Sequence, residues 1–251
     1  MNAFRLDQKT ALITGGGSGL GKAIARCFIA AGARVILVGR RERQLDQVVA
    51  ELGSSAHAFP GDVTHLTELP RWIEDLESQV GAIDILVNNA GVHLKKDALE
   101  TSDTEFASVL QTHLHASFAL SREAARRMAS RKSGHVLFIA SMTGLFGVSK
   151  VAAYSAAKAA LLGITRALAV EWAEHGIRVN AIAPGWIETD LSRPILDKDP
   201  DRKNKILTRT PLRRLGQPLD IGWAAVYLSS PAADFVTGTT LVVDGGALIG
   251  F

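Results

Sequence analysis

The sequence predicts an α/β fold, a doubly wound parallel sheet of seven strands with helices on both faces. Two observations predict it. Short apolar segments rich in β-branched residues alternate along the chain with longer segments whose apolar residues recur at helical spacing. A glycine-rich turn joins the first of these strands to the first helix. Apolar strands that alternate with amphipathic helices form parallel sheets covered by helices on both faces.

The expected elements follow one another in a regular order. We expect strands at 10–14, 34–39, around 57–63, 83–91, 135–141, 178–185 and 239–246. We expect helices at 20–31, 42–52, 67–80, 103–130, 154–175 and 221–229. The remaining long stretch, 188–218, is polar, charged and contains prolines, so it is predicted to be a lid over a substrate. No linker or repeat divides the chain, and 1–251 is predicted to be a single domain.

Composition excludes several classes of protein. The 28 basic and 25 acidic residues give a net charge of only +3, with no concentrated basic face of the kind that nucleic acids require. Cys27 is the only cysteine, so no intrachain disulfide or cysteine cluster can form, and it is interpreted as a small core residue. The seven histidines show no metal-ligand spacing, and no metal site is expected. Without a leader-like or membrane-spanning apolar run, we expect a soluble, cytoplasmic protein.

The turn between the first strand and the first helix reads Thr14-Gly-Gly-Gly-Ser-Gly-Leu-Gly21. Glycines at this junction let the backbone approach a pyrophosphate, which then lies on the free N–H groups of the helix N-terminus. Turns also need glycine for conformational reasons alone, so the motif by itself is weak. Its position between a strand and a helix favours a Rossmann-type dinucleotide site.

With the spacing T-G-x-x-x-G-x-G, the chain resembles the short-chain dehydrogenase/reductase family, and the resemblance extends over nearly its whole length. Asn88-Asn89-Ala90-Gly91 matches the family's N-N-A-G, and Ser141, Tyr154 and Lys158 keep its S-x12-Y-x3-K spacing. The resemblance implies a cofactor site made of Gly15, Gly17, Ser18, Gly19, Leu20, Gly21, Arg40, Asp62, Val63, Asn89, Ala90, Gly91, Tyr154, Lys158, Pro184, Gly185, Ile187 and Thr189. In it, Asp62 and Val63 would contact the adenine ring, and Thr189 the nicotinamide carboxamide.

The end of the second expected strand bears on the choice of cofactor. NAD-preferring relatives usually carry an acidic residue there, whereas this chain has Gly39 followed by Arg40 and Arg41. A guanidinium at Arg40 can form a bidentate contact with a 2′-phosphate, which predicts NADP(H) as the preferred cofactor with NAD(H) possible. Two observations oppose this. Ser18 stands where many NADP-preferring relatives have a basic residue, and the arginines could simply be solvated.

Tyr154 and Lys158 are four residues apart in a helical segment and therefore share a face. A nearby ammonium favours the phenolate, so Lys158 is expected to lower the pKa of Tyr154 toward the range where proton exchange is efficient. By resemblance, Lys158 also binds the nicotinamide ribose, and Ser141 hydrogen-bonds the substrate oxygen. The three residues predict hydride exchange between a ketone and a secondary alcohol, with Tyr154 as acid and base.

One position departs from the family pattern. The family usually has a catalytic asparagine in the helix after N-N-A-G, and His113 stands there in this chain. A neutral imidazole has one donor and one acceptor, so it could hold the water that the asparagine is thought to hold. It could equally pack inside a helix interface. If His113 serves in such a relay, its titration should distort the pH–rate profile near the imidazole range.

The substrate is the least determined feature. The segment 208–216 resembles gluconate 5-dehydrogenase-type members of the family, and 179–191 looks equally like 3-oxoacyl-carrier-protein reductases. A sugar acid or polyol-type keto compound is favoured, with a 3-oxoacyl thioester as the alternative. A dinucleotide sensor without catalysis is the alternative from another class, supported only by His113. Relatives are usually tetramers, so a homotetramer is expected, with no nucleic-acid or membrane partner.

Overall fold

The structure is a computed structural model, which describes residues 3–189 and 192–250 apart from the side chain of Ile195. Seven strands form one parallel sheet in the order β3-β2-β1-β4-β5-β6-β7. They are β1 (Thr10–Thr14), β2 (Arg34–Gly39), β3 (Ala56–Pro60), β4 (Ile85–Asn88), β5 (Gly134–Ile139), β6 (Ile177–Pro184) and β7 (Thr240–Val243). The predicted doubly wound parallel sheet is confirmed.

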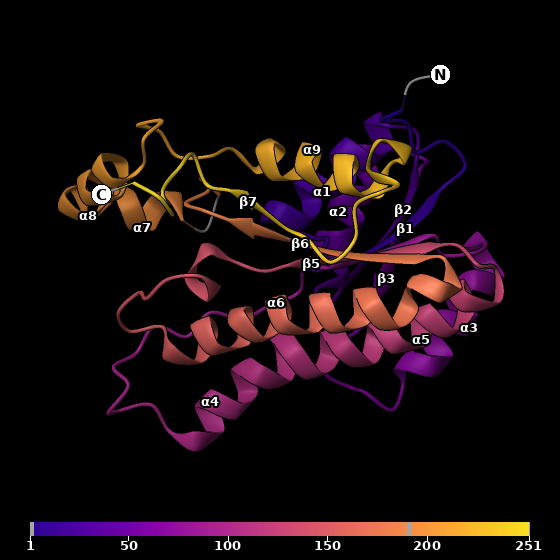
Figure 1. The fold of residues 1–251 in the computed structure, drawn as a ribbon, viewed down its shortest axis with the longest axis horizontal. Helices are drawn as coiled ribbons and strands as arrows, with labels where there is room; N and C mark the ends of the chain where they lie inside the picture. The colour runs from indigo at the N-terminus through magenta and orange to yellow at the C-terminus, as the bar shows by residue number, and fades with distance from the viewer. Residues whose placement is uncertain (1–2, 190–191, 251) are drawn as a thin grey trace.

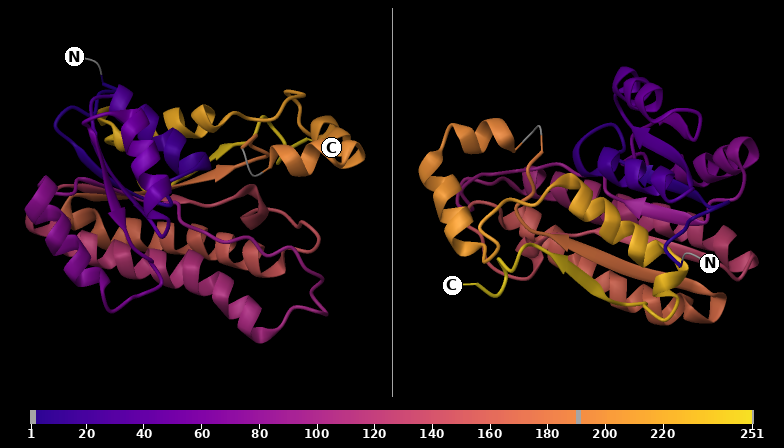
Figure 2. Two further views of the ribbon diagram at one scale, coloured as in Figure 1. Left: turned by 180° about the vertical axis from the view of Figure 1, so that it is seen from behind. Right: turned by 90° about the horizontal axis from the view of Figure 1, so that it is seen from above.

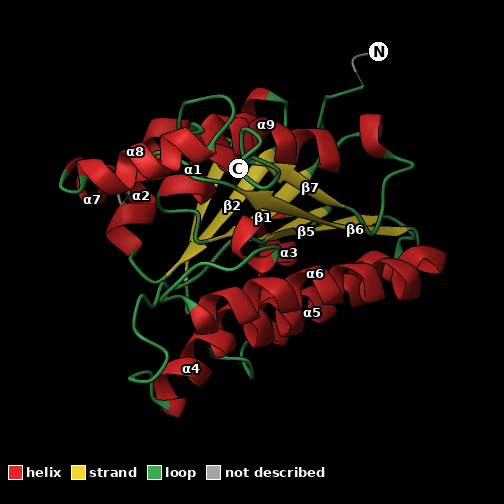
Figure 3. Ribbon diagram, turned by 60° about the vertical axis from the view of Figure 1, so that its left-hand side comes forward, coloured by secondary structure: helices red, strands yellow, loops and turns green. Residues whose placement is uncertain are grey.

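Helices cover both faces of the sheet (Figures 1 and 2). On one face lie α1 (Gly19–Ala30), α2 (Glu42–Leu52) and α9 (Pro218–Ser229). On the other lie α3 (Leu69–Val80), α5 (Ala116–Ser130) and α6 (Ala152–Trp172), with α4 (Asp103–Leu110) leading into α5. Figure 3 shows the sheet between these two layers.

Each layer packs on alternate residues of the strands, as the pleat requires. In β1, Leu12 belongs to the core beneath α3, α5 and α6, whereas Ala11 and Ile13 belong to the core beneath α1, α2 and α9. Cys27 is buried in the second core, and burial raises the pKa of its thiol to about 11. It is therefore the unreactive core residue that the sequence indicated.

The strand order places a functional crevice. From β1 the chain proceeds outward to β2 and β3, then returns to β4 on the other side of β1. Ligands of open parallel sheets bind at such a switch point, beyond the carboxyl ends of the strands. The glycine turn follows β1 and the Asn89–Gly91 segment follows β4, so both lie at this point.

Two predicted segments differ from the structure. The single helix expected at 103–130 is interrupted by a π-helical turn, η1 (Gln111–His115), between α4 and α5. A π-turn contains one more residue than an α-turn, so it changes the face to which the following side chains point, a shift that periodicity does not reveal.

The second difference is in the expected irregular lid, where the structure has two helices, α7 (Arg193–Asp197) and α8 (Pro200–Arg209). They form a small apolar cluster with Leu196, Ile206 and Leu215. Figure 1 shows both helices beyond the carboxyl end of β6. Residues 190 and 191 of the expected lid lie outside the described residues. Within the described ranges, no helix is both long and apolar enough to cross a membrane.

Candidate active site

A cleft of about 700 Å³ opens beyond the carboxyl ends of β1, β4, β5 and β6. It brings together every site residue predicted from the sequence except Gly21. These are Gly15, Gly17, Ser18, Gly19, Leu20, Arg40, Asp62, Val63, Asn89, Ala90, Gly91, His113, Ser141, Tyr154, Lys158, Pro184, Gly185, Ile187 and Thr189. Residues separated by up to 174 positions therefore meet in one site.

The glycine turn is held by a hydrogen-bond network between β1 and β4. The Thr14 hydroxyl accepts from the Asn89 and Ala90 backbone N–H groups, at 2.9 and 3.0 Å. The Asn89 side-chain amide donates to the Thr14 carbonyl at 2.9 Å and to the Gly15 carbonyl at 3.3 Å. Gly21 lies beneath the turn, where a Cβ would overlap the Gly15 carbonyl. Its role is to let the helix pack under the turn, which explains why it does not line the cleft.

The glycines that face the cleft are open on that side. A Cβ at Gly19 would meet only the Thr189 methyl, at 3.9 Å, and one at Gly17 would make ordinary contacts with Gln44 and Leu45. Ser18 is the residue before α1, whose first N–H groups have no partner within the helix. The backbone thus leaves room for an anion at the positive end of the helix.

At the far end of the cleft, Arg40 faces Asp62. Their closest charged atoms are 3.8 Å apart, and the Arg40 side chain is 70% exposed. Asp62 accepts hydrogen bonds from the backbone N–H and the hydroxyl of Thr64, at 3.0 and 2.8 Å. Burial opposes ionisation of Asp62, but these hydrogen bonds and the Arg40 charge outweigh it and hold the pKa below its usual value. An exposed guanidinium therefore stands at the end of β2, next to an ionised carboxylate.

Ser141 has its hydroxyl proton available to another acceptor. Its oxygen accepts from both the backbone N–H and the hydroxyl of Thr143, each at 3.1 Å. The loop behind Ser141 lies directly on α6, because a Cβ at Gly144 would be 2.8 Å from the Lys158 carbonyl carbon. The close approach fixes Ser141 relative to the helix that carries Tyr154 and Lys158.

Burial governs the ionisation of Tyr154 and Lys158. The Lys158 ammonium lies 5.4 Å from the Tyr154 ring centroid and donates to the Ile139 carbonyl at 2.6 Å. Burial lowers the pKa of Lys158 to about 7, and burial raises the pKa of Tyr154, opposed by a hydrogen bond with Ser141. The expected lowering of the Tyr154 pKa is therefore not met, because desolvation of the phenolate outweighs its stabilisation.

His113 lies inside the π-turn with its ring edge-on to Tyr154, at 5.3 Å between centroids. Its Nε2 lies 2.7 Å from the Val92 carbonyl oxygen and 3.1 Å from the Val92 backbone nitrogen, and the neutral ring can make only one of these two hydrogen bonds. The shorter contact assigns the proton to Nε2, which then donates to the carbonyl. Its Nδ1 is buried and has no partner among the described residues. A Cβ at Gly91 would overlap the imidazole, so that glycine makes the space for it. The ring of His113 is therefore packed in the helix interface, which was one interpretation of this residue. It also keeps one free acceptor, which the other interpretation, a bound water, requires.

The pKa of His113 is far below the ordinary value of an imidazole. Burial, and then the Lys158 charge, lower it to about 3, so the ring stays neutral through the physiological range. The expectation of a His113 titration near the imidazole range is therefore wrong.

We expect the pH–rate profile of His113→Asn to have the same shape as that of the wild type, with kcat within about threefold, because an amide also offers an acceptor. His113→Leu should lower kcat by about tenfold or more if the free acceptor matters. Steady-state rates from pH 5 to 9 measure both, and equal rates for the Asn and Leu variants would contradict a polar role.

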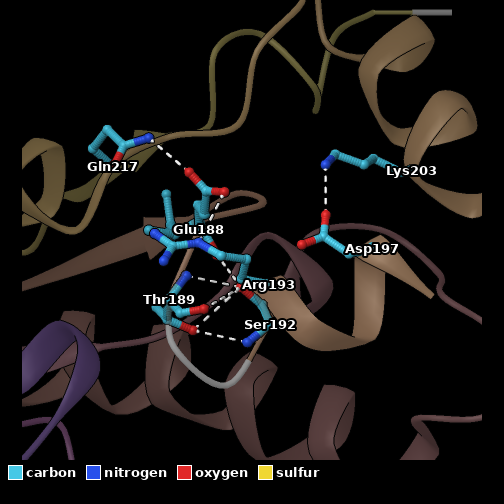
Figure 4. A network of polar contacts seen from close by, with 8 residues as sticks. Glu188, Thr189, Ser192, Arg193, Asp197, Lys203 and Gln217 are labelled. Atoms are coloured by element: carbon cyan, nitrogen blue, oxygen red, sulfur yellow. Dashed lines mark hydrogen bonds and ion pairs between the residues drawn. The ribbon is translucent and has the colours of Figure 1, made fainter. Parts of the chain in front are cut away.

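Polar contacts join the segment that follows β6 to α7 and to the start of α9 (Figure 4). Ser192 Oγ lies 2.8 Å from the Thr189 backbone nitrogen, from which it accepts, and 2.9 Å from the Ile187 carbonyl, to which it donates. Glu188 accepts from Arg193 at 3.3 Å and from Gln217 at 3.2 Å. These contacts anchor the beginning of the lid to its end.

Several residues that line the cleft had no assigned role in the sequence. His93 lies edge-on to Tyr154 at 5.1 Å, and Ser108 and Thr112 line the same end of the cleft. Trp186, which follows β6, also lines it. Only the position of His93 just after N-N-A-G pointed to it. No three histidine, cysteine, aspartate or glutamate side chains in the described part of the chain form a metal-binding group.

Comparison with known proteins agrees with this geometry. The model of a family described as enoyl-(acyl carrier protein) reductase matches residues 15–247. The chain belongs to the short-chain dehydrogenase/reductase family and is an oxidoreductase that acts on CH–OH groups.

Individual relatives have different substrates. The chain is 40% identical to galactitol 2-dehydrogenase (L-tagatose-forming) of Cereibacter sphaeroides, covering 97% of this chain and 96% of that protein. It is 38% identical to 2-dehydro-3-deoxy-D-gluconate 5-dehydrogenase of Dickeya dadantii, covering 99% and 98%. It is 37% identical to a 3-oxoacyl-acyl-carrier-protein reductase of Salmonella typhimurium, covering 96% and 97%.

Among solved structures, a gluconate 5-dehydrogenase from Burkholderia cenocepacia in complex with NADP and tartrate superposes with a TM-score of 0.94. It is 35% identical and covers 100% of this chain and 99% of that one.

Proposed function

We propose that the protein is an NADP(H)-dependent oxidoreductase that interconverts a ketone and a secondary alcohol of the sugar-acid or polyol type. The observation that carries the proposal is the convergence of Ser141, Tyr154 and Lys158 on the cleft that the glycine turn also lines. A nucleotide turn or a Tyr–Lys pair alone would be weak evidence. Together in one cleft they match a hydride-transfer site.

The residues present fit a dinucleotide. Gly17 and Gly19 leave open backbone toward the cleft, α1 presents its N-terminus there, and Arg40 stands at the end of β2. Asp62 and Val63 would hold the adenine, Asn89 to Gly91 and Lys158 the ribose side, and Pro184 to Thr189 the carboxamide. The bound nucleotide supplies or accepts the hydride.

Side chains of the protein itself donate and accept the proton of the reaction. The Ser141 hydroxyl, whose oxygen already accepts from Thr143, donates to the substrate oxygen and holds it beside Tyr154. The phenol of Tyr154 gives its proton to that oxygen in reduction and takes it back in oxidation. Lys158, with its pKa near 7, can exchange a proton at neutral pH and replenish Tyr154. His113 is proposed to hold a water beside this pair through its free Nδ1.

Other features of the proposal rest on the sequence and the relatives. Residues 188–218 are proposed as the lid over the substrate, in a single domain of 1–251. A cytoplasmic homotetramer is proposed by analogy with the family. The relatives support two substrate classes: two of them are named as dehydrogenases of a sugar alcohol and a sugar acid, and one as a 3-oxoacyl-acyl-carrier-protein reductase. The polar, cation-rich lid favours the first.

For the cofactor, we expect Arg40→Ala to lower kcat/KM for NADPH by about 10- to 100-fold and to leave kcat/KM for NADH nearly unchanged. Charge-assisted hydrogen bonds to a phosphate account for losses of this size. Arg43→Ala is the matched control, since Arg43 is exposed on α2 and does not line the cleft. A wild-type preference for NADH would refute the NADP(H) assignment.

Oxidation of NADPH with a panel of carbonyl compounds tests the activity itself. The panel should contain keto-sugar acids, ketohexoses, an acetoacetyl thioester, a keto-steroid and a small diketone. Turnover with a keto-sugar acid or ketohexose supports the proposal, and turnover with the thioester alone selects the alternative. Binding of the nucleotide without turnover of any carbonyl would indicate a sensor instead.

A further inference from the structure

Helix α8 of the proposed lid places an arginine against one residue of the cleft wall. Arg202 is on α8, half-buried, and its guanidinium carbon lies 5.8 Å from the centroid of the Trp186 ring. Trp186 lines the cleft at the end where Ser141 and Tyr154 meet. Stacking on an indole holds a guanidinium in place while its N–H groups remain free to donate.

The imidazole ring of His93 is influenced by the charge of Arg202 and contacts the ring of Tyr154. His93 also lines the cleft and lies edge-on to Tyr154, with 5.1 Å between the ring centroids. Burial first, and then the charges of Arg202 and Lys95, lower the pKa of His93. The positive charge of Arg202 therefore acts on the ring that lies edge-on to Tyr154, although Arg202 and His93 lie 109 positions apart.

Among the described residues of α8, Arg202 is a half-buried cation without a carboxylate partner. On α8 and α7, Lys203 pairs with Asp197 at 2.8 Å and Arg193 pairs with Glu188 at 3.3 Å. The side chain of Arg202 is engaged only with the indole in the described part of the chain. A half-buried guanidinium without a counter-charge favours an anion brought by a ligand.

The charges around the cleft agree with an anionic ligand at this end. Of the described residues that line the cleft, Asp62 is the only acidic one, and it lies beside Arg40 at the opposite, nucleotide end. The described lining of the cleft also contains Lys158, His93 and His113, and Arg202 stacks on Trp186 of the same lining. A carboxylate there meets cations and hydrogen-bond donors without a repelling charge.

We propose that Arg202 binds the carboxylate of a hydroxy-acid or keto-acid substrate and thereby selects sugar acids over neutral polyols. Trp186 supports the guanidinium, and the neutral ring of His93 supplies a further polar contact next to Tyr154. The inference rests on the proposed function, since it assigns the substrate class of that same site.

The test compares D-gluconate with D-sorbitol, two six-carbon substrates that differ in a carboxylate at one end. Oxidation of both is measured with NADP for the wild type, Arg202→Met, Arg202→Lys and the control Lys205→Met. Methionine keeps apolar contact with Trp186 but removes the charge. Lys205 is an exposed cation on the same helix, so its variant controls for the general charge of the lid.

We expect Arg202→Met to lower kcat/KM for D-gluconate by about 10- to 100-fold, mainly through KM, and to leave D-sorbitol within about twofold. Arg202→Lys should recover part of the loss because it keeps the charge without the planar fork. Lys205→Met should match the wild type with both substrates. An equal loss with both substrates, or no loss with D-gluconate, overturns the proposal.

Calorimetric titration of D-gluconate into the enzyme with NADPH gives a readout that needs no turnover. Binding that Arg202→Met weakens at least tenfold supports the carboxylate site even if neither alcohol is oxidised. Absence of D-gluconate binding to the wild type overturns it. Oxidation of D-sorbitol but not D-gluconate by the wild type also overturns it, while the proposed oxidoreductase function survives.

Discussion

Tyr154→Phe should reduce kcat by about 10²- to 10⁴-fold, the usual contribution of a positioned acid or base. The substitution removes only the hydroxyl and keeps the ring, which packs edge-on against His93 at 5.1 Å and His113 at 5.3 Å. The fold and the nucleotide end of the cleft should therefore persist. Single-turnover rates of NADPH oxidation measure the loss of the proton donor directly.

Nucleotide binding provides the control for Tyr154→Phe. The Kd for NADPH, measured by fluorescence titration, should change by less than about threefold. A variant that keeps more than a tenth of the wild-type kcat would contradict the assignment of Tyr154. A variant that loses nucleotide binding as well would show a structural role for the hydroxyl.

Lys158→Met should have two large effects of opposite sign. Activity should fall by about 10²-fold or more, because the variant cannot replenish Tyr154. Stability at neutral and acidic pH should rise, because burial lowers the Lys158 pKa from 10.5 to about 7 and the buried ammonium therefore opposes folding. Removing the buried charge should raise the free energy of unfolding by a few kcal/mol. Loss of the hydrogen bond from Lys158 to the Ile139 carbonyl offsets part of this increase.

The pH dependence of unfolding distinguishes this cause from others. Between about pH 7 and 10.5 the unfolded chain holds a proton on Lys158 that the folded chain does not, so wild-type stability should rise with pH across that window. Below pH 7 the cost of the charge is fully present. Lys158→Met should lose the Lys158 contribution to this slope, whereas the exposed Lys205→Met should keep it. Urea unfolding at several pH values gives both slopes, and parallel curves for wild type and Lys158→Met would refute the buried charge.

The elements and their order followed from local patterns. The observed bounds of β1, β2 and α2 are the same as those predicted from the sequence, to the residue. The spacing of apolar residues and the positions of turn residues, on which those bounds depend, are local properties of the chain. The prediction was less complete at 103–130 and 188–218. A π-turn and two short lid helices depend on what the segment packs against, which its own periodicity does not record.

The sequence by itself determined the parallel fold, the glycine turn and the spacing of Ser141, Tyr154 and Lys158, since these depend on residue types at fixed intervals. Only the tertiary structure decided the ionisation and surroundings of the site. The neutral state of His113 comes from the burial of its ring against Gly91 and Val92. The low pKa of Lys158 comes from the burial of its side chain, whose ammonium contacts the Ile139 carbonyl. The position of Arg202 over Trp186 likewise joins residues from α8 and from the end of β6. Desolvation and charge act through space, between groups that the chain places far apart and that only folding brings together.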